Sequence, residues 1–187
     1  EYLNLLDLTQ KIDVMHLPNV GIKTQRTVIA QPGLRYAQAD ALIRSLLLDE
    51  IFNSLSLPER NAIQERILNE IKGRMLEDIV LLETKMADPK KQVFVLQFPV
   101  GEFDMVVFDP AEGSCKIYEI KHSDKIVLQQ CRHLLDKQKC EDTAFRYGTI
   151  IGKYVIYRGA TTSLVQAGVS TQEDVTYLNV EEYLKKL

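Results

Sequence analysis

The segment from Gly101 to Lys121 constrains the fold more than any other part of the chain, because it has the pattern of a β-hairpin. Two runs rich in β-branched and aromatic residues, GEFDMVVFD and CKIYEIKHS, flank the turn-forming residues of PAEGS. A turn centred in PAEGS places Asp104 opposite Glu119 and Glu102 opposite Lys121. The hairpin therefore predicts which side chains meet across two neighbouring strands.

Side chains alternate along a strand, so the hairpin should have one apolar and one charged face. The apolar face is expected to carry Phe103, Met105, Val107, Tyr118 and Ile120, and the charged face Glu102, Asp104, Glu119 and Lys121. We expect the first face to pack in the core and the second to form a cluster of charges.

The charged face has two interpretations. Asp104 and Glu119 face each other, and like charges on paired strands are destabilising unless something compensates them. Directly paired side chains have Cβ atoms about 5 Å apart, close enough to share a hard cation such as Mg²⁺. With Lys121 beside it, this arrangement suits phosphodiester hydrolysis. The alternative is a solvated face on which Lys121 pairs with Glu102 or Glu119.

Composition limits the classes of function. The chain has 187 residues, 45% of them hydrophobic, and a net charge of −3, so a polyanion would have to bind at a local patch. No apolar run approaches the ~20 residues of a membrane helix and no signal peptide is evident, so we expect a cytoplasmic chain without a membrane partner. Cys115, Cys131 and Cys140 lack zinc-site spacing and are expected to be reduced thiols. The first residue is Glu1 rather than Met, which suggests a fragment.

The first third of the chain has mainly helical patterns. Apolar spacing predicts helices at Tyr2–Leu8 and from Tyr36 to about Phe52, with a chain break at Pro32-Gly33. A capping box, Ser56-Leu57-Pro58-Glu59, predicts a long helix to about residue 85. The buried stripe of that helix is expected to be Ile63, Ile67, Ile71, Met75 and Ile79.

Strands and shorter helices follow. A strand is predicted at Val93–Phe98, and Ser123 is expected to cap a second helix, DKIVLQQCRHLLDKQK, with Val127 and Leu134 facing the core. The last predicted elements are a strand centred on residues 154–157, a strand at 175–179 and a helix at 180–187.

Two polar residues on the predicted helices are candidates for the site. Glu77 lies off the apolar stripe, and it either pairs with Arg74 at the surface or is presented toward the hairpin cluster. Gln130 lies on the apolar face of the second helix, where it either bonds to backbone or contacts a substrate.

These residues resemble the PD-(D/E)XK nuclease superfamily, in which a helix, three strands, a helix and a strand follow one another. Asp104 lies on the second strand and precedes Glu119 of Glu119-Ile120-Lys121 on the third by 15 residues (119 − 104). Glu77 has the place of the first-helix acid and Gln130 that of the second-helix glutamine. The proline that names the superfamily is absent, and Phe103 stands before Asp104.

More narrowly, the chain is similar to the C-terminal nuclease-like domain of bacterial and archaeal AAA-type ATPases. The similarity rests on QPGLRYAQADALI, GRMLEDIVLLETK, GEFDMVVFDP and IYEIKHS. It implies an α/β (α+β) fold with a restriction-endonuclease-like core, in which a mixed sheet of αβββαβ order is flanked by helices. Residues 27–187 would be the nuclease-like domain and residues 1–26 the remnant of an upstream winged-helix or linker region. Gly21-Ile22-Lys23-Thr24 lacks the spacing of a phosphate-binding loop, so no ATPase site is expected here.

The resemblance implies divalent-metal-dependent phosphodiester hydrolysis, with DNA as the expected substrate and the upstream ATPase domain of the same chain as partner. Asp104 and Glu119, helped by the Ile120 carbonyl, would bind Mg²⁺ or Mn²⁺. Lys121 would position or activate the attacking water, and Glu77 would hold water or a second metal. Contacts to the nucleic-acid backbone are expected from Gln130, Lys125 and Arg132.

Two further interpretations stay open. The first is a catalytically silent module that uses the same fold to bind DNA or a protein partner. The second is a purely structural domain whose charges form scattered salt bridges.

Overall fold

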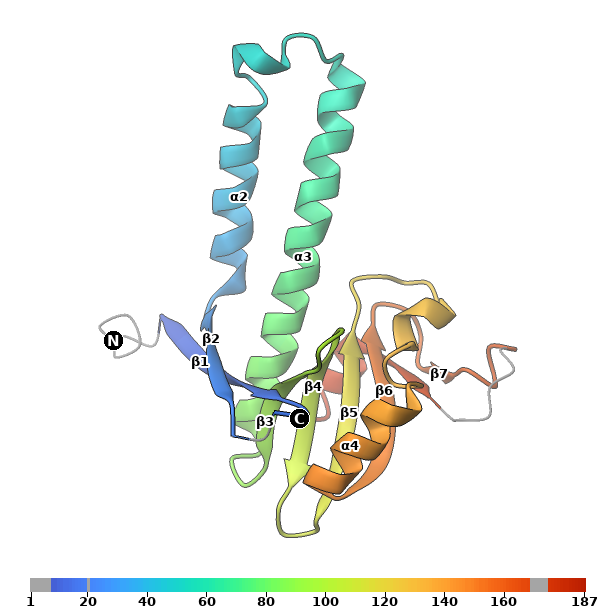
Figure 1. Cartoon of the computed structure of the whole chain (residues 1–187). Helices are drawn as coiled ribbons and strands as arrows, with labels where there is room; N and C mark the ends of the chain where they lie inside the picture. The colour runs from blue at the N-terminus through green and yellow to red at the C-terminus, as the bar shows by residue number, and fades with distance from the viewer. Residues whose placement is uncertain (1–7, 20, 169–174) are drawn as a thin grey trace.

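A mixed α+β fold, with an eight-stranded mixed sheet flanked by helices, is seen in the computed structural model (Figure 1). The structure describes residues 8–19, 21–168 and 175–187, so most of the helix predicted at residues 2–8 lies outside the described residues. The strands are β1 (Thr9–His16), β2 (Lys23–Ile29), β3 (Gln92–Gln97), β4 (Glu102–Asp109), β5 (Ser114–Ile120), β6 (Thr149–Tyr157), β7 (Thr162–Ser163) and β8 (Thr176–Asn179). The helices are α2 (Pro32–Leu46), α3 (Leu57–Ala87), α4 (Lys137–Tyr147) and α5 (Val180–Leu184), with 3₁₀ turns η1 (Glu50–Phe52) and η2 (Leu128–Cys131).

The strand order in the sheet is β2-β1-β3-β4-β5-β6-β8-β7. Strands β3, β4 and β5 are antiparallel neighbours, and β6 joins β5 in parallel. The chain order α3, β3, β4, β5, α4, β6 follows the predicted order of helix, three strands, helix and strand, although α4 covers other residues than the predicted second helix. The predicted division between residues 26 and 27 falls inside β2, and the assignment of residues 1–26 to an upstream region stays a prediction.

The β4–β5 hairpin has the predicted register. Met105 pairs with Tyr118, and Asp109 pairs with Ser114. The side chain of Asp109 accepts hydrogen bonds from the backbone amides of Ala111 and Glu112, at 3.1 and 3.2 Å. Gly113 completes the turn with a positive φ of 58°. The Asp109 hydrogen bonds and the Gly113 conformation thus set the register of the hairpin, and this register places the start of β4 beside the end of β5.

The predicted apolar face is wrong at Phe103. Met105 packs on one face of the sheet, whereas Phe103 packs on the other, with Val106. The register of β4 against β3 shifts between these residues, because Asp104 and Met105 together stand opposite a single residue of β3. This β-bulge breaks simple alternation, and it lies at a predicted site residue.

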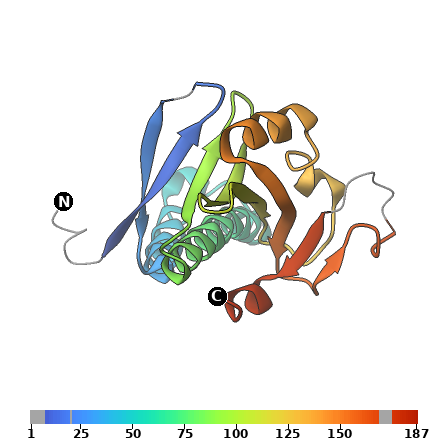
Figure 2. The same cartoon turned by 90° about the horizontal axis from the view of Figure 1, so that it is seen from below.

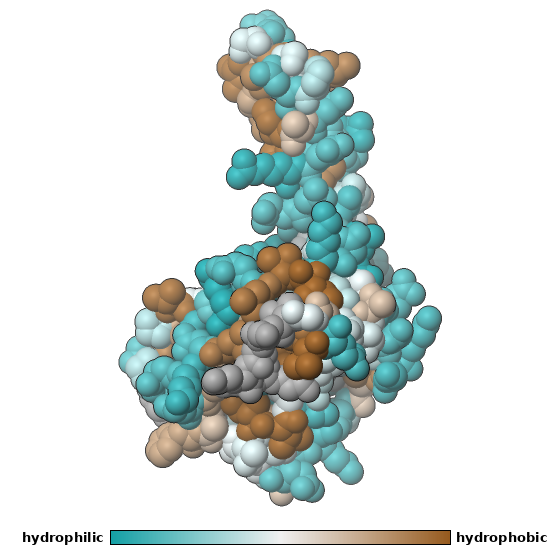
Figure 3. All heavy atoms as spheres, turned by 90° about the vertical axis from the view of Figure 1, so that its right-hand side faces the viewer, coloured by the Kyte–Doolittle hydropathy of each residue, from teal (hydrophilic) through white to brown (hydrophobic). Residues whose placement is uncertain are grey.

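Helices α2 and α3 form a hairpin that projects from the sheet (Figure 1). The predicted break at Pro32-Gly33 is wrong, because Pro32 begins α2, where a missing N–H has no consequence. The predicted capping at Ser56 is present, with the Ser56 amide donating to Glu59 at 2.8 Å. Exposed apolar side chains gather toward the end of the hairpin (Figure 3), and they include Leu42, Leu46, Leu48, Ile51 and Leu57.

The predicted stripe on α3 is largely wrong. The buried residues of α3 are Leu68, Asp78, Val80, Leu81, Leu82 and Thr84, whereas Ile67 is 38% exposed. A spacing of four residues drifts by about 40° per step around a helix of 3.6 residues per turn, so one such stripe cannot face one partner over four steps. The helix also changes partner, because Leu68 packs against α2 and Leu81 against the sheet.

The second predicted helix, over residues 124–139, is also wrong. The Ser123 hydroxyl accepts from the amide of Lys125 at 3.1 Å and forms a tight turn, after which only η2 follows before α4. Asp136 caps α4 by accepting from the Lys139 amide at 3.2 Å. Val127, predicted to face the core, is exposed. Gln130 therefore lies in the 3₁₀ turn η2 and Arg132 directly after it, and neither is on an α-helix.

Both faces of the sheet are covered. Helices α3 and α5 pack on one face, where Leu81 and Met105 share a cluster, and α4 packs on the other, where Phe103 and Leu134 share another (Figure 2). The C-terminal helix is shorter than predicted, ending at Leu184. Among the described residues, none of the helices combines the length and apolar character needed to span a membrane.

Candidate functional site

Two carboxylates and one ammonium meet where β4 begins and β5 ends. The Lys121 Nζ lies 2.7 Å from Asp104 Oδ2 and 2.6 Å from Glu119 Oε2. The backbone amide of Ile120 also donates to Asp104 Oδ2, at 2.7 Å. Both carboxylates are buried, and Glu119 is only 2% exposed. The structure thus brings Asp104, Glu119 and Lys121 together, as the hairpin register predicted.

The ion pairs of Lys121 differ from those expected if the charged face were solvated. That interpretation paired Lys121 with Glu102 or Glu119, whereas the ammonium contacts Asp104 and Glu119 together. The Lys121 backbone amide donates to the Ile156 carbonyl of β6 at 2.9 Å, which holds the residue at the edge of the core. The cluster is therefore mostly buried, and solvent screens its charges less than those of a surface pair.

Burial and the charge of Asp104 raise the pKa of Glu119 to about 8, against the lowering effect of Lys121. Burial lowers the pKa of Lys121, but the charges of Asp104 and Glu119 outweigh it, so the pKa of Lys121 is raised. Lys121 is consequently an ammonium at neutral pH. It can donate hydrogen bonds and offset negative charge, but it is not a base.

The cluster has one unsatisfied atom. Glu119 Oε1 is buried and has no hydrogen-bond partner among the described residues. An unpaired buried carboxylate oxygen is costly, so this atom is suited to a cation. Within residues 8–19, 21–168 and 175–187 no three Asp, Glu, His or Cys side chains gather as a metal site. Two carboxylates nevertheless match Mg²⁺, which usually binds one or two of them and keeps several waters.

Glu77 of α3 stands beside the cluster without joining it. Its Oε2 accepts from Arg74 at 3.0 Å and lies 3.8 Å from an Arg26 nitrogen. Burial raises the pKa of Glu77, and the charge of Asp104 raises it further, so the two acids interact electrostatically. Pairing with Arg74 was one of the two predictions for Glu77. A role as metal ligand stays a prediction.

A second buried acid, Asp78, was not identified from the sequence. It accepts from Arg26 of β2 at 3.0 Å and from Arg35 of α2 at 2.9 Å, partners 52 and 43 residues away. It fastens β2 and α2 to α3. The sequence did contain a signal that Asp78 is buried. The apolar residues Leu81 and Leu82 follow Asp78 by three and four positions, which places Asp78 on the inward face of the helix.

The predicted nucleic-acid contacts lie in two hollows that share Lys121. Gln130 and Arg132 line one of about 320 Å³ beside Glu119, and Lys125 lines one of about 670 Å³ on the α3 side. Gln130 Oε1 accepts from the Val127 amide at 3.2 Å, so the predicted backbone role is observed. Lys121 lies where the two hollows meet.

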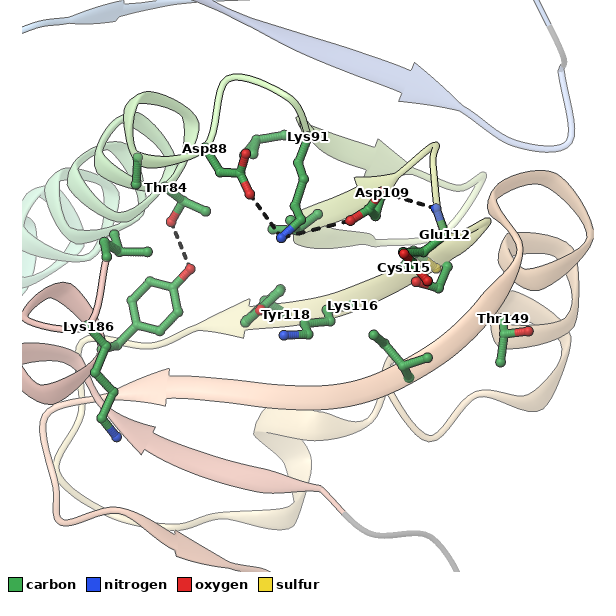
Figure 4. Close-up of a pocket in the computed structure, with 17 residues that line it drawn as sticks. Thr84, Asp88, Lys91, Asp109, Glu112, Cys115, Lys116, Tyr118, Thr149 and Lys186 are labelled. Carbon is green, nitrogen blue, oxygen red and sulfur yellow. Dashed lines mark hydrogen bonds and ion pairs between the residues drawn. The ribbon is translucent and has the colours of Figure 1, made fainter.

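Another hollow, of about 780 Å³, lies away from this cluster, beneath the end of α3 and beside α5 (Figure 4). Lys91 pairs there with Asp88 at 2.9 Å and lies 3.9 Å from Asp109. Thr84 and Tyr183 share a hydrogen bond of 2.8 Å. The charges of Lys91 and Asp88 thus compensate each other, and volume alone does not make a reactive site. We therefore place the candidate site at Lys121.

Comparisons with protein-family models, with curated proteins and with solved structures find no match to this chain. The resemblance to a nuclease superfamily consequently stays a prediction. A function has to be argued from the geometry and charge around Lys121.

Proposed function

We propose that this chain is a nuclease-type domain that hydrolyses phosphodiesters with the help of a divalent metal ion. The observation that carries the proposal is the convergence of two buried carboxylates, Asp104 and Glu119, on the single ammonium of Lys121. Buried acids with a raised pKa and a defined partner are typical of functional sites. The orphaned Glu119 Oε1 adds a place for a cation.

The element order supports a restriction-endonuclease-like core of the PD-(D/E)XK type. Helix α3 precedes the three antiparallel strands β3 to β5, and α4 leads into the parallel strand β6. We further propose that residues 27–187 are the C-terminal part of an AAA-type ATPase, with the upstream ATPase domain of the same chain as partner and DNA as substrate. This assignment is supported by the similarity of four segments, QPGLRYAQADALI, GRMLEDIVLLETK, GEFDMVVFDP and IYEIKHS.

Asp104 and Glu119 are the residues that would hold Mg²⁺ or Mn²⁺. A bound divalent ion supplies positive charge for the phosphate and acidifies water. Lys121 keeps its proton and offers N–H donors to the attacking water or to the phosphate oxygens. Glu77 holds Arg74 at the rim of the α3-side hollow, where the guanidinium can meet a substrate phosphate.

A second candidate function is a silent module that binds DNA or a protein without hydrolysis. One observation favours it: the Lys121 ammonium already compensates the two carboxylates that a metal would need. The acidic net charge of −3 also opposes broad nucleic-acid affinity.

Nicking of supercoiled plasmid in Mn²⁺ separates the two functions. We expect the wild type to nick, and we expect Asp104→Asn and Lys121→Ala to lower the rate by at least about 100-fold. Lys116→Ala is the matched control, because Lys116 lies on the same strand and outside the site. A wild type that neither nicks nor shifts its melting temperature with Mn²⁺ would contradict the hydrolytic proposal and favour the silent module.

A further inference from the structure

Three nitrogen-bearing side chains form a continuous chain of contacts on the α4 side of Glu119. The Lys139 Nζ lies 2.7 Å from His133 Nδ1, and the Arg132 Nε lies 3.2 Å from His133 Nε2. A neutral imidazole accepts a hydrogen bond at only one nitrogen. His133 therefore cannot accept from both side chains at once, and the Lys139 ammonium has the Val100 carbonyl, at 2.6 Å, as its other acceptor.

The nearest carboxylates, those of Asp136 and Glu119, act on Lys139 only through space. Among the described residues, none of the three nitrogen-bearing side chains forms an ion pair with a carboxylate within 4.0 Å. Lys139 is only 9% exposed, and its other contacts are the Val100 carbonyl at 2.6 Å and the Phe98 ring at 5.1 Å. Burial lowers the pKa of Lys139. A buried cation without a carboxylate partner is costly, so the site is suited to an anion.

The backbone is shaped around the His133 ring. Gly101 has a positive φ of 78°, and a Cβ at this position would collide with the imidazole. Lys139 bridges the ring to the Val100 carbonyl, in the turn between β3 and β4. A glycine and a buried lysine thus both hold His133 in one position.

The His133 ring lines the hollow of about 320 Å³. The other residues that line this hollow are Glu119, Lys121, Gln129, Gln130 and Arg132. We propose that Arg132 and His133 bind a backbone phosphate adjacent to the one hydrolysed at Lys121, and that Lys139 positions His133 for this contact. The inference rests on the proposed function, and it assigns the α4 side of the site to the neighbouring nucleotide of a strand.

Binding in the absence of cleavage tests the proposal. The probe is a fluorescein-labelled single-stranded oligonucleotide, with fluorescence anisotropy measured over a salt series in EDTA and again in Ca²⁺. We expect Arg132→Ala to raise the Kd about tenfold. It should also lower the slope of log K against log salt by about 0.7, because one phosphate contact is lost. Arg66→Ala is the matched control, since Arg66 is exposed on the projecting part of α3.

Lys139 needs a readout that separates positioning from folding. Lys139→Met should weaken oligonucleotide binding and leave the protein as stable as the wild type or more stable, because an apolar side chain replaces a buried cation. Lys137→Met, on the exposed side of the same helical turn, should change neither quantity. Weakened binding together with a loss of stability would contradict the positioning role.

The outcomes distinguish the inference from the function on which it rests. If the wild type nicks plasmid but Arg132→Ala and His133→Ala bind the oligonucleotide like the wild type, the phosphate subsite is wrong and the nuclease proposal stands. If these variants lose binding but the wild type never nicks, the subsite stands and hydrolysis is wrong. A response of the variants to inorganic phosphate alone, without any to the oligonucleotide, would also overturn the strand assignment.

Discussion

The Lys121 ammonium lies 2.7 Å from Asp104 Oδ2, although the two residues are 17 positions apart, one near the start of β4 and the other just after β5. The same nitrogen contacts Glu119 at 2.6 Å. The ammonium thus holds together two buried acids that would otherwise repel each other.

Removal of the ammonium should destabilise the fold. Lys121→Met leaves two buried carboxylates facing each other, and loss of one partner of a buried ion pair typically costs about 3–5 kcal/mol. We expect the lower end of that range, because the Lys121 side chain is partly exposed and Glu119 can take up a proton. Urea unfolding of Lys121→Met and of the control Lys116→Met measures the difference. Equal stability of the two variants would contradict the role of the ammonium.

Metal binding should stabilise the folded protein. A ligand at about 100 times its Kd adds about 2.7 kcal/mol to the free energy of unfolding, which raises the melting temperature. We expect a shift with Mn²⁺ in the wild type and none in Glu119→Gln, which lacks one carboxylate ligand. Glu112→Gln, in the exposed turn of the same hairpin, should keep the shift. A shift that persists in Glu119→Gln would place the metal elsewhere.

Stability should depend on pH through His133. Burial and the charges of Lys139 and Arg132 lower the pKa of His133 below its ordinary value. The unfolded state therefore takes up a proton more readily, so His133 contributes no penalty above about pH 6.5 and destabilises the fold as the pH falls below it. In urea unfolding, the free energy of unfolding should fall less, or rise more, from about pH 7.5 to pH 5.5 in His133→Gln than in His16→Gln. Glu119 contributes with the opposite sign in this range in both variants, so the difference between the variants reports His133. The same dependence in both variants would contradict this assignment.

Asp78 should stabilise the attachment of α2 and β2 to α3. Asp78→Ala leaves Arg26 and Arg35 without their shared acceptor, and we expect a loss of about 1.5–3 kcal/mol, the range for hydrogen bonds to charged groups. The control Asp49→Ala, in the exposed loop between α2 and α3, loses only an amide contact and should cost less. Thermal unfolding of both variants provides the comparison, and equal losses would show that Asp78 does not fasten these elements.

The helical hairpin offers a contrast between buried and exposed leucines. Leu68 is 7% exposed and packs against Ile43 and Leu47, so Leu68→Ala should cost about 2–5 kcal/mol. Leu48 is 79% exposed, and Leu48→Ala should change stability by at most about 0.5 kcal/mol. Chemical unfolding of the two variants measures both values. A large loss in Leu48→Ala would reveal a contact that the isolated chain does not show.

The sequence pattern predicted the β4–β5 hairpin well, because turn residues and the alternation of side chains along a strand depend on neighbours only a few positions away. The register that pairs Met105 with Tyr118 was predicted, and it brings Asp104 beside Glu119. The helix expected after Ser123 was wrong, because Ser123 bonds within its own turn and Asp136 begins the helix instead. Apolar spacing alone does not reveal which of two capping residues a helix will use.

The sequence by itself determined the order from α3 through β3 and β4 to β5, the pairing of β4 with β5 and the meeting of two acids with one lysine, since short-range periodicity encodes all three. Only the tertiary structure decided that Asp104 sits in a bulge, that Asp78 holds two arginines and that Lys139 supports His133. These arrangements join residues from separate elements, up to 52 positions apart. Their existence depends on how helices pack on the sheet, which the pattern of any one segment does not contain.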